Sequence, residues 1–243
     1  MKLKTVCLIV VSIILMFSMT LTSFAANKRA KYATVSYNVV SISGDKTGIE
    51  IVKTSRSKVR FEFLNVDNAS QYTTTAKVKN GVMTISIIKK GARPENISVA
   101  SDNYKNTVRV YVPYAQYRKF KINADGILVK MPDYPAMVNI TGGRQGGIYL
   151  EDNVISKGTY NIDFDTSYID ITANKIKSDI TVKQANGQVS LNFGKKPESL
   201  YLDTTKCFGI VELPRGWPNI YKVGKSHSQV TISNCGATYV TIK

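Results

Sequence analysis

The second half of the sequence repeats a short apolar pattern about every 20 residues. Five triplets carry apolar residues at both ends, and they begin at Ile127, Ile148, Ile169, Val189 and Val211. The successive steps are 21, 21, 20 and 22 residues. A repeat of this length that carries short strands and no helix predicts stacked coils, because one coil alone cannot bury its apolar face.

A second set of apolar pairs falls between the triplets, so each coil should contain two main strands about ten residues apart. These pairs are Val138/Ile140, Ile162/Phe164, Ile180/Val182 and Leu200/Leu202, followed by Ile220, Val230/Ile232 and Val240/Ile242. Side chains alternate across a strand, so the middle residue of each triplet should face outward. Those residues are Leu128, Tyr149, Asp170, Ser190 and Glu212. The glycine-rich segment 141–147 joins two strands and is interpreted as a corner of a coil.

The first half of the chain also has the alternation of β-strands. The predicted strands are residues 34–42, 48–54, 58–64, 73–78, 81–89 and 107–112. Asn80-Gly81 predicts a hairpin turn, because both positions tolerate a positive φ, and residues 91–106 are predicted to be a loop. The predicted fold is all-β. An N-terminal β-rich region (34–112) precedes a β-solenoid of regular coils (113–243), and together they form one all-β solenoid domain (34–243).

The first 25 residues have the layout of a secretory signal peptide. Lys2 and Lys4 precede an apolar run, and Ser23 and Ala25 place small residues at a cleavage site. The alternative is an uncleaved membrane anchor. A polar linker (26–33) follows, and no later apolar run approaches the length of a membrane span. We therefore expect a secreted, extracellular or cell-surface protein without a membrane span after cleavage.

The charge of the chain is strongly positive. Removing residues 1–25 removes Lys2 and Lys4, so the net charge falls by two, from +16 to +14. Such a field favours anionic partners, such as an envelope or wall polymer, over neutral ones. Simple solvation and a protein partner are the alternatives. The basic residues are scattered rather than clustered with aromatics, which argues against specific binding of nucleic acid.

Several segments, taken in order, resemble the bacterial putative-adhesin family, whose members carry a β-solenoid domain of unknown function. The similar segments are residues 58–63, 78–85 and 108–113, then Tyr117, Phe120 and Ile122, and then the repeated coils. The resemblance covers about residues 35–243. It implies an exported, non-enzymatic, adhesin-like binding protein or interaction scaffold, and it names no receptor and no cofactor.

Acidic residues offer two alternatives to a pure binding role. Alternation places Asn161, Asp163 and Asp165 on one strand face, with the oxygen ligands that calcium takes, so a calcium- or small-ligand-binding module is one alternative. The same carboxylates, with Asp170, could form an acid/base pair of a polysaccharide-active enzyme. The single histidine, His227, is interpreted as a solvated loop residue, since no catalytic motif surrounds it.

Aromatic residues are the remaining candidates for a binding surface. Tyr111, Tyr114 and Tyr117 lie close together in the sequence, and Trp217 stands between two prolines. Exposed rings can stack on sugars or anchor a protein interface. The alternative is that these rings cover the junction between the first half of the chain and the first coil, or the edge of a coil.

Two cysteines remain after signal cleavage, and they could pair outside the cytosol. Cys207 lies four residues before Val211, and Cys235 lies five residues after Val230. If Val211 and Val230 occupy equivalent places, the cysteines are offset by about nine residues along the coil. This offset argues against a disulfide, which requires Cα atoms within about 7 Å.

Overall fold

The fold is that of a computed structural model. The structure describes residues 39–91, 97–100, 103–113, 117, 119–125, 128–134, 136–142, 147–152, 154–155, 159–164, 167–183, 187–193, 197–207, 210–225, 229–235 and 239–242. The expected signal peptide (1–25) and linker (26–33) lie outside these residues, as do Tyr114, Asp165 and His227. No helix in the described part of the chain is long and apolar enough to cross a membrane.

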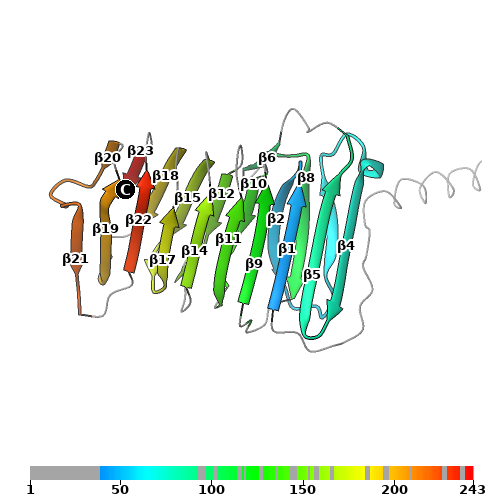
Figure 1. The fold of residues 1–243 in the computed structure, drawn as a ribbon, viewed down its shortest axis with the longest axis horizontal. Coiled ribbons are helices and arrows are strands. Elements are labelled where there is room, and N and C mark those ends of the chain that lie inside the picture. The colour runs from blue at the N-terminus through cyan, green and yellow to red at the C-terminus, as the bar shows by residue number, and fades with distance from the viewer. Residues whose placement is uncertain are drawn as a thin grey trace, which may run out of the picture.

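The described residues form an elongated all-β structure of two large sheets (Figure 1). The ten-stranded sheet contains, in spatial order, β21 (Ile220–Val223), β19 (Leu200–Cys207), β22 (Gln229–Cys235), β17 (Asp179–Lys183), β14 (Thr159–Phe164), β11 (Met137–Gly142), β9 (Lys119–Asp125), β1 (Val39–Asp45), β5 (Val82–Lys89) and β4 (Tyr72–Lys79). The nine-stranded sheet contains β20 (Ile210–Glu212), β23 (Tyr239–Ile242), β18 (Gly187–Phe193), β15 (Ser167–Ala173), β12 (Gly147–Glu151), β10 (Leu128–Met131), β2 (Gly48–Thr54), β8 (Thr107–Pro113) and β3 (Arg60–Leu64).

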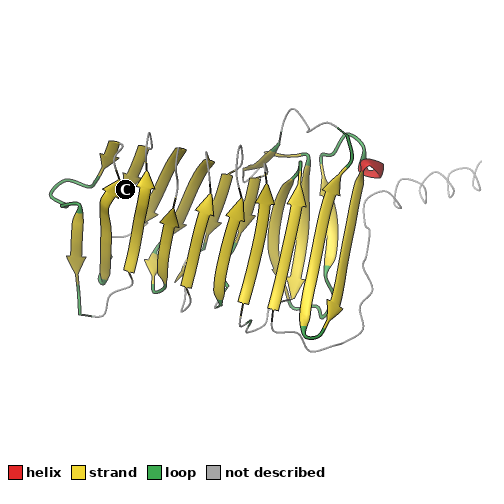
Figure 2. Ribbon diagram, in the orientation of Figure 1, coloured by secondary structure: helices red, strands yellow, loops and turns green. Residues whose placement is uncertain are grey.

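Smaller elements lie at the corners (Figure 2). They are the parallel pair β13 (Val154–Ile155) and β16 (Lys175–Ile176), the antiparallel pair β6 (Ser98–Ala100) and β7 (Asn103–Lys105), and the short 3₁₀ helix η1 (Ala69–Gln71). The all-β prediction is confirmed. The predicted loop 91–106 is wrong in part, because Ser98–Ala100 and Asn103–Lys105 form the antiparallel strands β6 and β7.

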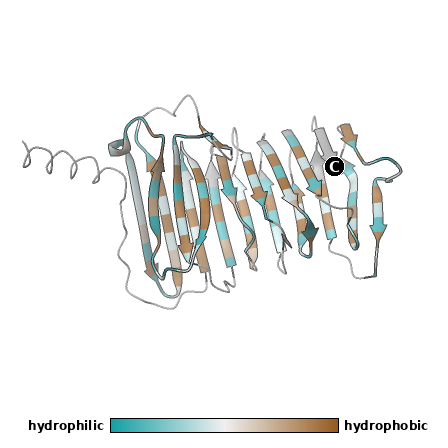
Figure 3. Cartoon of the chain, turned by 180° about the vertical axis from the view of Figure 1, so that it is seen from behind, coloured by the Kyte–Doolittle hydropathy of each residue, from teal (hydrophilic) through white to brown (hydrophobic). Residues whose placement is uncertain are grey.

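In the middle of the molecule the chain alternates between the two sheets, and each strand pairs in parallel with the strand one repeat later. One ladder stacks Ile122, Ile140, Ile162 and Val182 in the ten-stranded sheet. The other stacks Val129, Ile148, Ile169 and Val189 in the nine-stranded sheet. All eight side chains are buried in one hydrophobic core between the sheets. Hydrophobic and hydrophilic residues alternate along these strands (Figure 3), as two-sided strands require.

Two predicted registers are wrong by two residues. Val129, not Ile127, pairs with Ile148, so Lys130 is the outward residue that matches Tyr149, and Leu128 pairs with Gly147. In the other sheet the apolar pair in register with Ile180/Val182 is Tyr160/Ile162 rather than Ile162/Phe164. The cause is that the corners differ in length, so the strand positions drift against a fixed repeat.

The order of strands at the C-terminal end also differs from the prediction. The last two strands, β22 and β23, lie between the β17/β18 coil and the β19/β20 coil. Val189 therefore pairs with Val240, and Val211 pairs with Val240 from the outer side. The β1/β2 coil is placed similarly at the other end, between β9/β10 and the strands β5 and β8. The strands before and after residue 112 thus share the same two sheets.

Antiparallel strands lie at both ends of the stack. β4 and β3 pair antiparallel with β5 and β8, and β21 pairs antiparallel with β19. The predicted hairpin at Asn80-Gly81 is confirmed, with φ values of 51° and 71° in the turn that joins β4 to β5. The remaining edge, at the C-terminal end of the nine-stranded sheet, is β20, which pairs in parallel with β23.

The expected offset between the two cysteines is wrong. Val211 and Val230 belong to different sheets, so they are not equivalent positions. Val230 pairs instead with Leu202, and Cys207 and Cys235 each follow these partners by five residues. The structure makes Cys207 and Cys235 direct Cα partners on neighbouring strands.

Candidate functional site

The outer face of the ten-stranded sheet carries polar residues in two matched rows. The first row is Ser41, Lys121, Asn139, Asn161 and Thr181, and the second is Asn123, Thr141, Asp163 and Lys183. The rows run across β1, β9, β11, β14 and β17, perpendicular to the strands. Each outward residue is separated from the next on its strand by a buried one, because strand side chains alternate. We call these nine residues, together with Lys119, the lysine face.

The lysine face is hollowed. Its ten residues, with parts of Ile122 and Ile162, line a shallow hollow of about 620 Å³. In the middle of the hollow the side-chain amide of Asn161 donates a hydrogen bond to the Oδ1 atom of Asn139 at 3.0 Å. Adjacent strands in a sheet lie about 4.8 Å apart, so the polar groups of each row recur at that interval along the hollow.

The charge of the hollow is positive. Lys119, Lys121 and Lys183 line it together with a single carboxylate, that of Asp163. Lys121 and Lys183 are exposed and Lys119 is half-buried. Among the described residues, no ion pair involves any of these three lysines. Their charges therefore remain available to a ligand.

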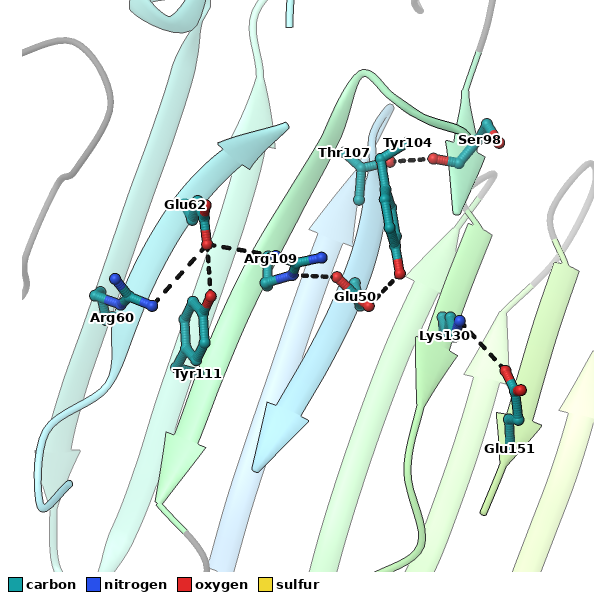
Figure 4. A network of polar contacts seen from close by, with 10 residues as sticks. All are labelled: Glu50, Arg60, Glu62, Ser98, Tyr104, Thr107, Arg109, Tyr111, Lys130 and Glu151. Atoms are coloured by element: carbon teal, nitrogen blue, oxygen red, sulfur yellow. Dashed lines mark hydrogen bonds and ion pairs between the residues drawn. The ribbon is translucent and has the colours of Figure 1, made fainter. Parts of the chain in front are cut away.

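The outer face of the nine-stranded sheet is organised in the opposite way (Figure 4). Arg109 of β8 lies between two carboxylates: it bonds Glu50 of β2, and its guanidinium is 3.6 Å from Glu62 of β3. Tyr104 donates a hydrogen bond to Glu50, and Tyr111 donates one to Glu62 at 2.6 Å. The charges on this face neutralise one another within the protein.

Further charge pairs on that face complete the contrast. Arg60 lies 4.0 Å from Glu62 and stacks over the Tyr111 ring, 3.8 Å from its centroid. Lys130 pairs with Glu151 at 3.2 Å. Within the described ranges, the positive residues on the nine-stranded sheet thus have acidic partners, whereas the three lysines of the hollow form no ion pair.

The pKa values of Tyr104, Tyr111 and Arg109 are shifted by burial and by their hydrogen bonds. Burial raises the pKa of Tyr104, and its hydrogen bond to the charged Glu50 raises it further. Tyr111 is shifted in the same way, by burial and by the hydrogen bond to Glu62. Burial acts to lower the pKa of Arg109, but its hydrogen bonds, first to Glu50, outweigh that and raise it. The raised pKa values keep Tyr104 and Tyr111 protonated and Arg109 positively charged at neutral pH.

The predicted calcium ligands lie partly on the lysine face. Asn161 and Asp163 project from β14 into the hollow, while Asp165 lies outside the described residues. In the part of the chain that the structure describes, no three His, Cys, Asp or Glu residues are placed to hold a metal ion. The structure therefore brings two of the three candidates together, beside lysines rather than beside further carboxylates.

One member of the proposed acid/base group lies apart from Asp163, and the pair of Asp163 with Asp165 stays a prediction because Asp165 lies outside the described residues. Asp170 lies on β15 of the nine-stranded sheet, and Asp163 lies on β14 of the other sheet. The two side chains project from the outer faces of these two sheets, with the hydrophobic core between them. Asp170 also accepts hydrogen bonds from Tyr168, Thr172 and Asn192 at 2.9–3.1 Å. Asp163 and Asp170 cannot act on one glycosidic bond from opposite faces of the molecule.

The aromatic candidates are dispersed. Tyr117 is only 3% exposed, donates to the carbonyl of Pro113 and packs on Phe120 and Tyr134, so its ring belongs to the core. Tyr111 is held in the Arg60–Glu62 network. Trp217 stacks on Tyr221, with ring centroids 3.6 Å apart and planes inclined by 2°, at the C-terminal end of the stack. These rings do not form a common surface.

Comparison with known proteins found distant likenesses only. No family model matches the chain, and no curated protein matches its sequence. One similar solved structure is a putative cell adhesion protein from Clostridium sporogenes, with 16% identity and a TM-score of 0.45 over 89% of this chain and 98% of that one. Another is a putative adhesin from Bacteroides fragilis, with 10% identity and a TM-score of 0.35 over 89% and 97%.

Sequence reasoning missed the lysine face because its residues come from distant segments. Lys119 and Lys121 were visible only as scattered basic residues, and Lys183 lies about 60 positions later. The available signal was the alternation Lys-Phe-Lys-Ile-Asn at 119–123, which places both lysines on one strand face. Only the stacking of strands shows that Lys183 and the asparagines share that face.

Proposed function

We propose that this chain is an exported, non-enzymatic protein with adhesin-like binding, and that its lysine face binds an anionic polymer of the cell envelope. The N-terminal pattern of a signal peptide and the net charge of +14 without it support export and an anionic partner. We also propose that the stacked coils form a β-solenoid, with antiparallel strands at three of its four sheet edges.

One observation carries this proposal: among the residues that the structure describes, the three lysines of the hollow form no ion pair, whereas the opposite face neutralises its charges internally. An unpaired cation gains more from an external anion, because no internal partner must first be displaced. Asparagine amides and threonine and serine hydroxyls beside the lysines can donate hydrogen bonds to phosphate, carboxylate or sugar oxygens.

The repeated geometry suits a polymer rather than a small ligand. Donors recur along each row at the strand spacing of about 4.8 Å, so successive units of an extended chain meet equivalent groups. Multiple weak contacts along one chain combine into useful affinity, since each bound unit raises the effective concentration of the next.

The test is binding of the full chain to isolated bacterial wall that carries its phosphate-bearing polymer, and to the same wall after that polymer has been extracted. The test variant is Lys119→Gln/Lys121→Gln/Lys183→Gln. The control is Lys58→Gln/Lys177→Gln/Lys225→Gln, which removes the same charge from exposed lysines outside the hollow. Each lysine near an anionic surface is worth about 1 kcal/mol. The test variant should therefore bind on the order of a hundredfold more weakly.

Binding should also weaken as salt is raised, because exposed charges are screened. An equal loss of affinity in the control variant would show that net charge alone drives binding and would refute a site at the lysine face. Unchanged binding by the test variant, or equal binding to extracted wall, would also refute it and would favour a protein partner.

A further inference from the structure

The register between β19 and β22 brings two distant cysteines together. The two strands run parallel, with Leu202 paired to Val230 and Cys207 paired to Cys235. Adjacent strands lie about 4.8 Å apart. That separation falls within the range of about 4.4–6.8 Å between Cα atoms that a disulfide bridges. Cα partners on adjacent strands are therefore expected to lie within the distance that a disulfide requires.

The sulfur of Cys207 is directed at the neighbouring strand. Its thiol donates to the backbone carbonyl of Ile232 on β22 at 3.3 Å. The pairing shifts register between Asp203 and Cys207, which bends this part of β19 relative to a regular ladder. Cys207 is half-buried, so a small reagent can still reach it.

We propose that Cys207 and Cys235 form an intramolecular disulfide in the exported protein. The two thiols lose two protons and two electrons as the S–S bond forms. An external disulfide, of an oxidoreductase or of oxidised glutathione, accepts them and is reduced to two thiols. The proposal shares with the proposed function only the expectation of export, and it does not depend on polymer binding.

The bond would join β19 and β22 covalently at the C-terminal end of the stack. It closes residues 208–234 into a loop that contains β20 and β21, the outermost strands of the two sheets at this end. It also ties β22, which is inserted between β17 and β19, to its outer neighbour. Release of the terminal coil then requires breaking a covalent bond as well as the strand pairing.

The bond can be tested on the full chain carrying Cys7→Ser, so that two thiols remain. After folding in a glutathione redox buffer, the protein is alkylated and digested with trypsin without reduction. Cleavage at Lys206, Arg215 and Lys225 should leave peptides 207–215 and 226–243 joined, with a mass two hydrogens below their sum. The protein should migrate as a monomer, and reduction should separate the two peptides.

The matched control is Thr205→Cys/Cys207→Ser, which moves the thiol two residues along β19, about 6–7 Å away. The bridge should be at least tenfold less abundant in this variant. Equal bridging would show that the bond forms without the native register and would overturn the proposal. Two alkylated cysteines in the parent protein, or bonding only between molecules, would overturn it as well.

Hydrogen exchange tests whether the disulfide stabilises the C-terminal strands, independently of the peptide mapping that tests whether the bond forms. Reduction should accelerate exchange of the β22 amides at least tenfold and leave those of β11 and β14 unchanged. Equal exchange of the β22 amides before and after reduction would show that the bond does not stabilise this end of the stack.

Discussion

Gly224 shows how a single residue controls the C-terminal end of the fold. Its φ is +79°, and a Cβ atom there would lie 2.4 Å from the carbonyl oxygen of Glu198 and 2.9 Å from the Cα of Ser199. Both are backbone atoms and cannot rotate away. Gly216 has a similar φ of +85°, but no atom lies within 4 Å of its Cβ position. Comparing an alanine substitution at these two glycines therefore separates the destabilisation caused by a steric clash from that caused by the positive φ angle.

We predict that Gly224→Ala lowers the free energy of unfolding by about 2–4 kcal/mol, because overpacking adds to the left-handed strain. Gly216→Ala should cost only about 1–2 kcal/mol, the strain alone. Urea denaturation followed by circular dichroism measures both changes. Equal losses in the two variants would contradict the role of the Glu198 contact.

At the scale of elements, strands were predictable where side chains alternate clearly. Residues 48–54 were predicted as a strand and are β2, and Asn80-Gly81 was predicted as a turn and joins β4 to β5. The β6–β7 hairpin escaped prediction because each of its strands has only three residues, too few for a period. The two strands are also tied to a large sheet by a contact between residues far apart in the sequence: Tyr104 of β7 donates a hydrogen bond to Glu50 of β2.

The contact between Tyr104 and Glu50 predicts a pH dependence for the β6–β7 hairpin. The pKa of Tyr104 is raised above its usual 10.0 by burial and by Glu50. The stabilisation from the neutral phenol is therefore complete below pH 10.0 and is lost as the pH rises through the raised pKa. Glu50→Gln removes the negative charge and should lower the pKa of Tyr104 toward 10.0.

Tyrosine-ring NMR during an alkaline titration measures this pKa, with Tyr104→Phe for assignment. The matched control is Glu62→Gln, which should lower the pKa of Tyr111 and leave that of Tyr104 in place, because Tyr111 donates to Glu62. A fall in the pKa of Tyr104 in the control alone would contradict this arrangement.

At the scale of the whole molecule, the strand pairing in the middle of the two sheets was predictable and the pairing at their ends was not. Ile148 and Ile169 repeat with the coil and do pair, because each coil must bury the same face. Val211 and Val240 have equally suitable apolar patterns, so sequence alone cannot decide which of them follows Val189. That choice depends on how the ends are capped, which is a property of the complete stack.

The candidate site was predictable only in part, for the same reason. The sequence identified Asn161 and Asp163 as outward residues of one strand, and the structure places both in the hollow. It could not show that Lys121 and Lys183 flank them, since these lie on β9 and β17. The residues of such a surface come from different repeats of the sequence. Which of them become neighbours is known only when the register between the strands is known.

The register also makes one coil removable as a unit. Thr159 pairs with Asp179 and Ile169 pairs with Val189, so both sheets repeat after 20 residues at this point. Deleting residues 159–178 would bring β17 onto β11 and β18 onto β12 in register. The deletion removes Tyr160, whose hydroxyl contacts the buried Asp133. Ile180→Tyr should restore it, because residue 180 is the direct partner of residue 160.

We predict that the deletion of 159–178 with Ile180→Tyr folds cooperatively, because stacked repeats contact mainly their neighbours. Its denaturant m-value should fall in proportion to the surface lost, and its circular dichroism should remain that of β-sheet. Deleting only residues 169–178 removes half a coil and sends every later strand to the wrong sheet, so this control should not fold. Comparable folding of the two deletions would show that the pairing between coils does not determine the structure. Folding of the half-coil deletion alone would do so as well.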